Sequence, residues 1–261
     1  MSKFKNVVIL GASQGIGKAL VQEYASAGSS LVLLSRNESS IAELCTGICS
    51  KNGTAFSKGC DVTDIKSVKA GIDFALEKLK TIDLVIINSG VGGPNWMESF
   101  SSEQFRQTFE VNTFGIAHVL ESVLPVMKKQ GYGTIAGVTS LADVRGYGGS
   151  SSYSASKAAG SILLEAARVE LKKDNIRVIT VRPGFVKTAM TDKNEFKMPL
   201  LMQPEKAAKR IYKGIEAGRS IVQFPFPIVM ATRLIKILPN WIYDWGMNLA
   251  RPKKCTMWNE Q

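Results

Sequence analysis

The chain has 261 residues, of which 45% are hydrophobic and 21% are charged. This composition provides enough apolar residues for a substantial core, and it excludes an intrinsically disordered or fibrous protein. The 33 basic and 22 acidic residues give a net charge of +11, which is typical of chains that bind nucleic acid, a membrane surface or a phosphate-bearing ligand. Because Lys and Arg form no dense run interleaved with aromatic residues, we expect no nucleic-acid partner.

The length favours one large domain over two. No apolar run approaches the roughly 20 residues of a membrane-spanning helix, and residues 1–6 contain no hydrophobic leader, so we expect a cytoplasmic protein. The four cysteines match neither paired zinc ligands nor a redox C-x-x-C motif. The single histidine, His118, lies in an apolar helical stretch. We therefore expect no metal site and interpret His118 as a packing or interface residue.

Short apolar, β-branched runs alternate with longer amphipathic stretches along the first two thirds of the chain. The runs predict strands and the longer stretches predict helices. The expected strands cover residues 7–10, 31–34, 55–60, 84–87, 134–138 and 176–181. The expected helices cover residues 16–27, 39–51, 67–80, 104–130 with a break near Asn112, and 154–173. This repeated order predicts an α/β fold with a single doubly wound, Rossmann-like parallel sheet and helices on both faces.

The pattern changes after Arg182. Residues 187–203 have no clear period and predict a flap, while a helix at 204–217 and a strand at 220–223 are expected to complete the sheet. Residues 228–245 place Arg233 and Lys236 on one side and apolar side chains largely on another. We therefore divide the chain into a dinucleotide-binding catalytic domain, residues 1–223, and an apolar, basic C-terminal extension of the same domain, residues 224–261.

Three glycines, Gly11, Gly15 and Gly17, follow the first expected strand and open the first expected helix, with Ser13 and Ile16 among them. Glycines let the backbone turn tightly and approach a pyrophosphate, whose charge then faces the N–H groups of the helix. The spacing G-x-x-x-G-x-G differs from the common G-x-G-x-x-G fingerprint, so a turn needed only for packing is the alternative. The position after the first strand favours the dinucleotide site.

The second expected strand ends at Ser35 and Arg36. An acidic residue at this point binds the ribose 2′-hydroxyl of NAD, whereas arginine pairs with the 2′-phosphate of NADP. Arg36 beside the neutral Ser35 therefore favours NADP(H), and a solvated surface arginine is the alternative.

Ser140 follows the fifth expected strand, and Tyr153 and Lys157 lie four residues apart on the next helix. A lysine one turn after a tyrosine lies on the same face, so its charge is expected to lower the pKa of the phenol from about 10 and make the hydroxyl a proton donor or acceptor. Such a pair alone is common on solvated helix faces. Together with Ser140 and an upstream dinucleotide site, it predicts acid–base chemistry without histidine.

With these residues, the sequence resembles the short-chain dehydrogenase/reductase family over about residues 5–223, and its NADP-preferring type in particular. The resemblance implies that Asn112, Ser140, Tyr153 and Lys157 are the catalytic residues. It also implies contacts with the cofactor from the glycine loop, the strand ends and the segment after the sixth strand. The implied cofactor-binding residues are Gly11, Ser13, Gly15, Ile16, Gly17, Ser35, Arg36, Asp61, Val62, Asn88, Gly90, Tyr153, Lys157, Pro183, Gly184, Val186 and Thr188.

The resemblance implies an oxidoreductase that transfers a hydride between NADP(H) and a carbonyl or alcohol carbon, a carbonyl reductase in the reducing direction. Tyr153 would protonate the carbonyl oxygen, Ser140 would hold it, Lys157 would bind the ribose, and Asn112 would support a water-linked proton path. The chain departs from the family pattern at Leu10, and at Ile87 and Ser89 on either side of Asn88. These departures are expected to alter hydrogen bonds between two strand ends, while every proton-transfer group is present.

Two alternatives use the same fold without turnover: a sensor of NADP(H), and a protein whose main role is interaction with a membrane surface. The substrate wall is expected from residues 92–97, 144–149 and 187–203, which makes a small apolar carbonyl or alcohol the expected substrate. The helical stretches 112–130 and 154–173 predict a homodimer or homotetramer. The extension is interpreted either as packed against the enzyme or as a cover of the active site that touches a membrane peripherally.

Overall fold

The computed structural model describes residues 1–193 and 198–249. Seven parallel strands form one sheet in the order β3-β2-β1-β4-β5-β6-β7. The prediction of a doubly wound parallel sheet is therefore confirmed. The strands are β1 (Asn6–Leu10), β2 (Ser30–Ser35), β3 (Ala55–Gly59), β4 (Leu84–Ile87), β5 (Gly133–Val138), β6 (Ile176–Pro183) and β7 (Ile221–Phe224).

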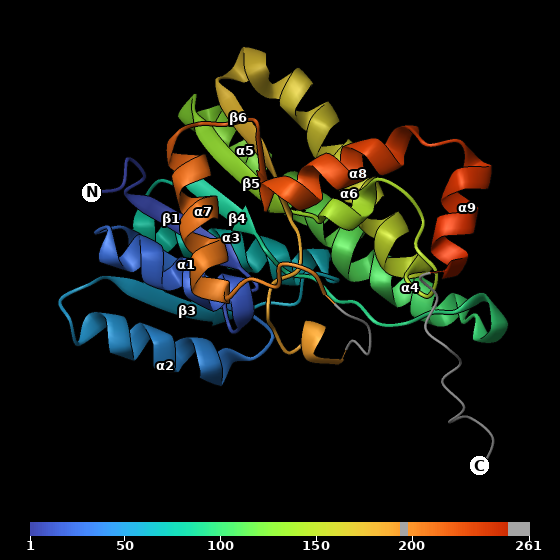
Figure 1. Ribbon diagram of the computed structural model, residues 1–261. Coiled ribbons are helices and arrows are strands. Elements are labelled where there is room, and N and C mark those ends of the chain that lie inside the picture. The colour runs from blue at the N-terminus through green and yellow to red at the C-terminus, as the bar shows by residue number, and fades with distance from the viewer. Residues whose placement is uncertain (194–197, 250–261) are drawn as a thin grey trace.

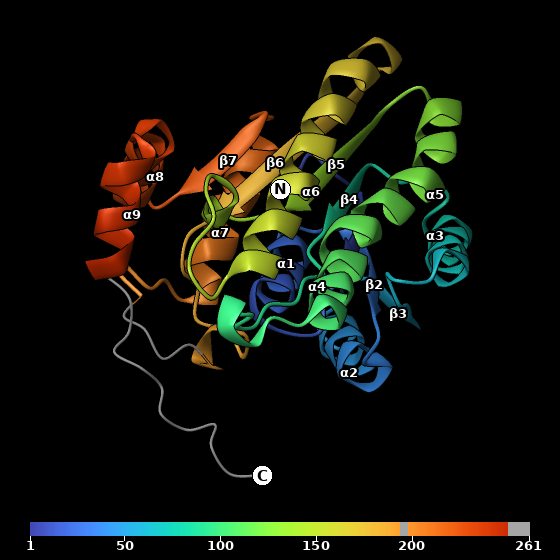
Figure 2. The same ribbon diagram turned by 90° about the vertical axis from the view of Figure 1, so that its right-hand side faces the viewer.

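Helices cover both faces of this sheet (Figures 1 and 2). One face is packed by α1, α2 and α7, and the other by α3, α5 and α6. The helices are α1 (Gly15–Ser26), α2 (Glu38–Cys49), α3 (Ile65–Leu79), α4 (Ser102–Phe109), α5 (Gly115–Gln130), α6 (Ser151–Glu170), α7 (Pro204–Glu216), α8 (Phe226–Ile237) and α9 (Asn240–Leu249). None of the described helices is long and apolar enough to cross a membrane.

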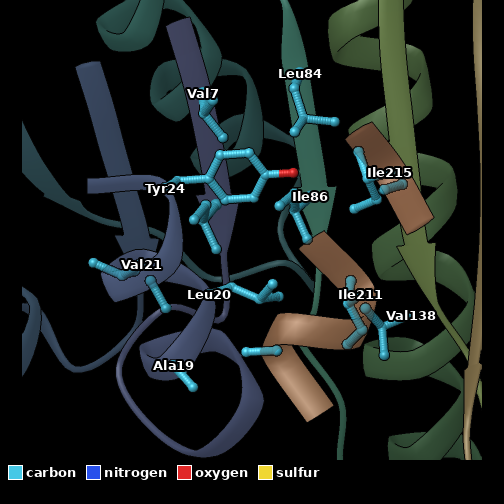
Figure 3. Close-up of a cluster of buried hydrophobic side chains, with 14 of the residues drawn as sticks. Val7, Ala19, Leu20, Val21, Tyr24, Leu84, Ile86, Val138, Ile211 and Ile215 are labelled. Carbon is cyan, nitrogen blue, oxygen red and sulfur yellow. The ribbon is translucent and has the colours of Figure 1, made fainter. Parts of the chain in front are cut away.

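The alternation of side chains along β1 explains why its sequence is apolar from Val7 to Leu10. Val7 and Ile9 enter the cluster beneath α1 and α7, whereas Val8 and Leu10 enter the opposite cluster. Figure 3 shows the first cluster, where Leu20 from α1 and Ile211 from α7 meet side chains of the central strands. A strand that is buried on both faces has no polar positions, which is the pattern of an inner parallel strand.

The order of the strands places a topological switch point between β1 and β4. The chain leaves these neighbouring strands toward opposite ends of the sheet, so a crevice forms outside their carboxyl ends. The glycine loop follows β1 and Asn88 follows β4. The fold therefore places both segments at the edge where doubly wound sheets bind their ligands.

The helix expected at residues 104–130 is divided at the anticipated point. α4 ends at Phe109, a π-helical turn covers Glu110–Phe114, and α5 begins at Gly115. The turn contains Asn112, which is fully buried. The expected break near Asn112 thus takes the form of a π-helical turn that lies between α4 and α5.

The single amphipathic stretch expected at residues 228–245 is instead two helices. α8 ends at Ile237 and α9 begins at Asn240, because Pro239 lacks a backbone N–H and its ring excludes a continuous helix. The extension is also not uniformly exposed: Phe224 is the last residue of β7 and is buried, as is Val229. Residues 250–261 of the predicted extension lie outside the described residues.

Residues 187–203 were expected to form a flap without regular structure. The described part contains a short 3-10 turn at Thr191–Lys193 and an isolated bridge between Val186 and Met202. Residues 194–197 of this predicted flap lie outside the described residues.

Candidate active site

The glycine loop has a backbone that only glycine adopts without strain. Gly11 and Gly15 have φ angles of +74° and +54°. A Cβ atom at Gly17 would lie 2.0 Å from the carbonyl oxygen of Gly11, so this position also excludes a side chain. The loop therefore turns tightly enough to expose its backbone to a ligand.

The N-terminus of α1 is suited to an anion. Its N-cap residue, Gln14, makes no side-chain capping hydrogen bond, and the first turn contains no acidic residue. The first N–H groups of a helix lack intrahelical partners and carry a partial positive charge. A pyrophosphate at this point would satisfy them, so this end of the site fits a dinucleotide.

The segment that follows β6 closes over the glycine loop. A Cβ atom at Gly15 would lie 2.9 Å from the side-chain methyl carbon of Thr188, which places Thr188 against the loop. Gly184 donates its backbone N–H to Phe224 at 2.7 Å, which fixes the segment after Pro183 against β7. Val186 is buried. Of the predicted cofactor residues in this segment, Thr188 thus lies against the glycine loop, while Gly184 lies against the end of β7.

The adenosine end of the expected site lies at the carboxyl ends of β2 and β3. The Ser35 hydroxyl donates to the Ser13 hydroxyl at 3.0 Å, which ties the end of β2 to the glycine loop. Arg36 is exposed directly after β2, and no carboxylate of the described residues forms an ion pair with it. Its guanidinium therefore remains available to a phosphate. The carboxylate of Glu38, which sequence reasoning missed, lies over Gly59.

Asp61 and Val62 follow β3, as expected. One carboxylate oxygen of Asp61 accepts from both the backbone N–H and the hydroxyl of Thr63, each at 2.9 Å. The Val62 side chain is buried, and its carbonyl oxygen contacts Nδ1 of His118 at 2.8 Å. His118 has a structural contact beneath this loop, in agreement with its interpretation as a packing residue.

Asn88 links the ends of the two central strands despite the departures from the family pattern. Its backbone N–H donates to Leu10 at 3.0 Å, and its side-chain Nδ2 donates to Gly11 at 2.9 Å. Leu10 is fully buried in the core. The apolar residue at position 10 is therefore accommodated by packing, while Asn88 holds the glycine loop against β4.

Ser140, Tyr153 and Lys157 lie together on the same side of the site. The Ser140 and Tyr153 side chains are hydrogen-bonded, and the Lys157 ammonium lies 5.8 Å from the centre of the Tyr153 ring. Lys157 is 4% exposed and donates to the Val138 carbonyl oxygen at 3.0 Å. A Cβ atom at Gly90 would lie 3.1 Å from Lys157 Nζ, so the residue after Ser89 must be small.

The side chain of Asn112 connects the segment after β4 to α6 through three hydrogen bonds. Its Oδ1 accepts from the Val91 N–H at 2.8 Å, and its Nδ2 donates to the Val91 carbonyl at 2.9 Å and to the Ser156 hydroxyl at 3.0 Å. Both amide donors are therefore used in joining the segment after β4 to α6.

The pKa of the Tyr153 phenol changes in the opposite direction to the expectation. Burial raises this pKa, the carboxylate of Asp143 adds to the increase, and the hydrogen bond with Ser140 opposes it. Burial also lowers the pKa of Lys157 to about 8, although Asp143 favours its charged form. The expected lowering of the phenol pKa by Lys157 is therefore not found, because desolvation of the phenolate is the largest influence on this pKa.

Two arginine contacts near the site were not foreseen. Arg182 on β6 pairs with both carboxylate oxygens of Asp143, three residues after Ser140. Arg145, in the same loop, donates to the Leu238 carbonyl at 2.7 Å and stacks on the Tyr243 ring at 4.1 Å. These pairs are far apart in the sequence and have no periodic signal, so only the folded chain reveals them.

The expected substrate wall is apolar around Tyr153. A Cβ atom at Gly92 would lie 3.0 Å from the Tyr153 ring and 3.2 Å from the Met190 sulfur. Trp96 packs against Gly149, so the loops at 92–97 and 144–149 are in contact. Among the described residues, no three His, Cys, Asp or Glu side chains are grouped as a metal site.

The chain was then compared with known proteins. The model of the family described as short chain dehydrogenase matches residues 5–198. A 7alpha-hydroxysteroid dehydrogenase of Escherichia coli (strain K12) is 35% identical over 184 residues, which are 70% of this chain and 72% of that protein. An uncharacterized oxidoreductase of Myxococcus xanthus (strain DK1622) is 34% identical over 248 residues, 92% of this chain and 95% of that protein.

A solved structure is also similar in both sequence and fold. It is a 7 alpha-hydroxysteroid dehydrogenase complexed with NADH and 7-oxo glycochenodeoxycholic acid, and it is 30% identical with a TM-score of 0.77. The match covers 84% of this chain and 92% of that chain. The family match extends from the glycine loop past Tyr153 and Lys157 to the segment after β6. The chain therefore belongs to the short chain dehydrogenase family of oxidoreductases.

Proposed function

We propose that the protein transfers a hydride between NADP(H) and an apolar carbonyl or alcohol substrate, and that it reduces a ketone or aldehyde with Tyr153 as proton donor. The observation that carries this proposal is the cluster of Ser140, Tyr153 and Lys157 next to Gly90, at the switch point of the sheet. The catalytic core is residues 1–223, and residues 224–261 extend it.

The pKa shifts favour the reducing direction. Because burial raises the pKa of Tyr153, its hydroxyl remains protonated near neutral pH and can donate to a carbonyl oxygen. The Ser140 hydroxyl, hydrogen-bonded to the phenol, lies where it can hold that same oxygen as negative charge develops on it. Two groups then act on one oxygen atom, and neither requires histidine.

Lys157 and the glycine loop fit a nicotinamide dinucleotide. An ammonium group has three N–H donors, and Lys157 uses one of them on Val138, so two remain for ribose hydroxyls. The N–H groups at the start of α1 would fit the pyrophosphate, because Gln14 provides no side-chain cap for them. When bound, the cofactor supplies or accepts the hydride.

Arg36 supports the choice of NADP(H) over NAD(H). It is exposed beside the adenosine end and has no carboxylate partner among the described residues. A guanidinium pairs with a phosphate through two parallel hydrogen bonds. The 7 alpha-hydroxysteroid dehydrogenase structure contains NADH, so the proposed preference rests on Arg36 and not on that relative.

The class of substrate is supported by the wall around Tyr153. Met190 provides apolar, adaptable surface beside Tyr153, and Trp96 adds an apolar ring against Gly149. The similar dehydrogenase of known structure holds an oxo derivative of a large, mainly apolar ring system. We therefore propose an apolar ketone or aldehyde as the substrate.

The test is oxidation of NADPH by the purified protein with a panel of carbonyl compounds that runs from small polar ketones to polycyclic ones. We expect turnover with apolar members of the panel, and a smaller rate with NADH. Tight NADPH binding without turnover of any carbonyl, or of the matching alcohols with NADP, would contradict an enzyme and favour a sensor.

A further inference from the structure

The surface of α8 and α9 exposes an unusual number of large apolar side chains. On α8 these are Phe226, Met230, Leu234 and Ile237, with exposed fractions of 71%, 45%, 58% and 77%. On α9 they are Trp241, Trp245 and Leu249, with 74%, 67% and 69%. We call these seven side chains the apolar face. Large exposed apolar side chains gathered on neighbouring helices mark an interaction site.

On each of the two helices, the exposed apolar residues lie along one side. Phe226, Met230, Leu234 and Ile237 recur at intervals of three and four residues, so they share one side of α8. Val229 and Thr232, on the other side, are buried against the enzyme. On α9, the three exposed apolar residues recur at intervals of four. Figures 1 and 2 both place the two helices together at one edge of the molecule.

The charged side chains of α8 and α9 are mainly basic. Arg233 and Lys236 are exposed on α8 next to the stripe, and Asp244 is the single acidic residue of α8 and α9. These two cations favour an occupant that is apolar at its centre and negatively charged at its border.

We propose that the apolar face docks on the surface of a membrane that contains anionic lipids. Amphipathic helices that lie in a bilayer interface combine a face of large apolar residues, often tryptophan, with lysine and arginine at its border. Tryptophan prefers this boundary because its ring is amphipathic. A second copy of the chain fits the surface less well, since it would bring Arg233 and Lys236 toward the same cations of its partner.

Hydrogen bonds of Arg145 connect α8 and α9 to the loop between Ser140 and Tyr153. The Arg145 guanidinium donates to the carbonyls of Ile235 and Leu238 at 3.2 and 2.7 Å, and to the Asn240 side chain at 2.7 Å. It thereby holds the corner between α8 and α9 from within the loop that joins Ser140 to Tyr153. Membrane docking would thus set the orientation of the active site relative to the bilayer, where apolar carbonyl compounds concentrate.

The test is sedimentation of the full chain with vesicles of phosphatidylcholine alone or mixed with phosphatidylglycerol. We expect binding to the anionic vesicles, weaker binding at high salt, and the weakest binding to phosphatidylcholine alone. Trp241→Ser with Trp245→Ser should weaken binding to both kinds of vesicle at least about tenfold. Arg233→Gln and Lys236→Gln should each weaken binding to the anionic vesicles about fivefold.

Two further variants make the outcome decisive. Ile221→Ser changes a 45% exposed apolar residue at the start of β7 and should leave binding unchanged. Phe226→Ser with Leu234→Ser repeats the test on α8 if the tryptophan variant does not fold. The proposal fails if the full chain stays in the supernatant or if both pairs of variants bind like the unmodified protein. A loss of self-association without lipid in these variants would instead identify a subunit contact. Since sedimentation requires no turnover, its outcome is independent of the proposed reaction.

Discussion

Asp143 and Arg182 form a bidentate ion pair behind the loop that begins at Ser140. The Arg182 Nε lies 3.1 and 2.9 Å from the two carboxylate oxygens of Asp143, and the Ser161 hydroxyl donates to the same carboxylate. The Asp143 side chain is 2% exposed. The pair therefore joins the loop after β5 to β6 and α6. The Asp143 carboxylate also favours a higher pKa for both Tyr153 and Lys157, although burial lowers the pKa of Lys157 overall.

Asp143→Asn should affect both stability and the pH dependence of reduction. It leaves the partly buried Arg182 without a carboxylate, which should lower the free energy of unfolding by about 2–4 kcal/mol. Removal of the negative charge should also lower the pKa of Tyr153, so the decline in reduction rate at alkaline pH should begin at a lower pH. Denaturant unfolding and pH–rate profiles measure the two effects.

Two control variants separate these effects. Arg182→Gln breaks the same pair but keeps the Asp143 carboxyl, so it should reduce stability without the same lowering of the Tyr153 pKa. Asp73→Asn changes an exposed carboxylate on α3 and should change neither property. Identical pH–rate profiles for Asp143→Asn and the unmodified protein would show that Asp143 does not influence the proton donor.

The apolar pattern was sufficient to predict the sheet. β4 begins at Leu84 and ends at Ile87 as predicted, because a parallel strand that is buried on both faces has apolar residues from end to end. The residues grouped from short motifs were also brought together, since the carboxyl ends of neighbouring parallel strands share one edge of the sheet. Ser140 and Tyr153, in hydrogen-bonded contact, illustrate this.

The rest depends on contacts without a local signal. Asp143 and Arg182 are 39 residues apart, and nothing in either neighbourhood indicates the other. The direction of the Tyr153 pKa depends on how completely the phenol is desolvated, which the lysine spacing does not show. Pro239 by itself indicates the end of a helix, but the apolar residues on both sides of it fit one amphipathic pattern. The sequence therefore predicted a single stretch where the structure has two helices.

Tyr153→Phe should nearly abolish carbonyl reduction while the affinity for NADPH stays within about twofold, because the variant removes only the proton that is donated. The loss of rate should be at least about 10²-fold. Turnover with the best substrate of the panel and fluorescence titration with NADPH measure the two quantities. Substantial reduction by Tyr153→Phe would place the proton donor elsewhere. Tyr132→Phe, a 39% exposed tyrosine directly before β5, is the matched control and should retain turnover.

Arg36→Asp should reverse or remove the preference for NADPH. The exposed guanidinium supplies a charge-assisted partner for the 2′-phosphate, and an aspartate would repel that phosphate while accepting from a ribose hydroxyl. We expect the ratio of kcat/KM for NADPH and NADH to fall by at least about 10²-fold. Lys66→Asp, an exposed change at the start of α3, should leave the ratio unchanged. Equal use of both cofactors by the unmodified protein would contradict the proposed preference.

Lys157 should make the stability of the cofactor-free protein depend on alkaline pH. Its pKa is lowered from 10.5 to about 8 by burial, so between these values the unfolded chain binds a proton that the folded chain does not. Stability therefore rises with pH in this window. The gain relative to Lys157→Met should reach up to about 3 kcal/mol.

The comparison with Lys157→Met removes the contributions of other groups, such as Cys60, whose pKa burial raises to about 11. Denaturant unfolding of both proteins across pH 8 to 10.5 provides the measurement. Parallel stability curves for the two proteins would mean that Lys157 is not desolvated in the folded chain.

The helices α5 and α6 should form the contact of at least a homodimer. Phe114, in the π-helical turn before α5, and Ile162 and Val169 on α6 are 49%, 67% and 64% exposed, which is apolar surface that the monomer leaves uncovered. Ile162→Glu should place an unpaired charge in this contact and raise the dissociation constant at least about 100-fold. Light scattering at micromolar concentration measures the mass. Met230→Glu on α8 is the matched control and should leave the mass unchanged. A monomeric unmodified protein would contradict the prediction. If Met230→Glu caused dissociation and Ile162→Glu did not, the subunit contact would lie on the apolar face and not on α6.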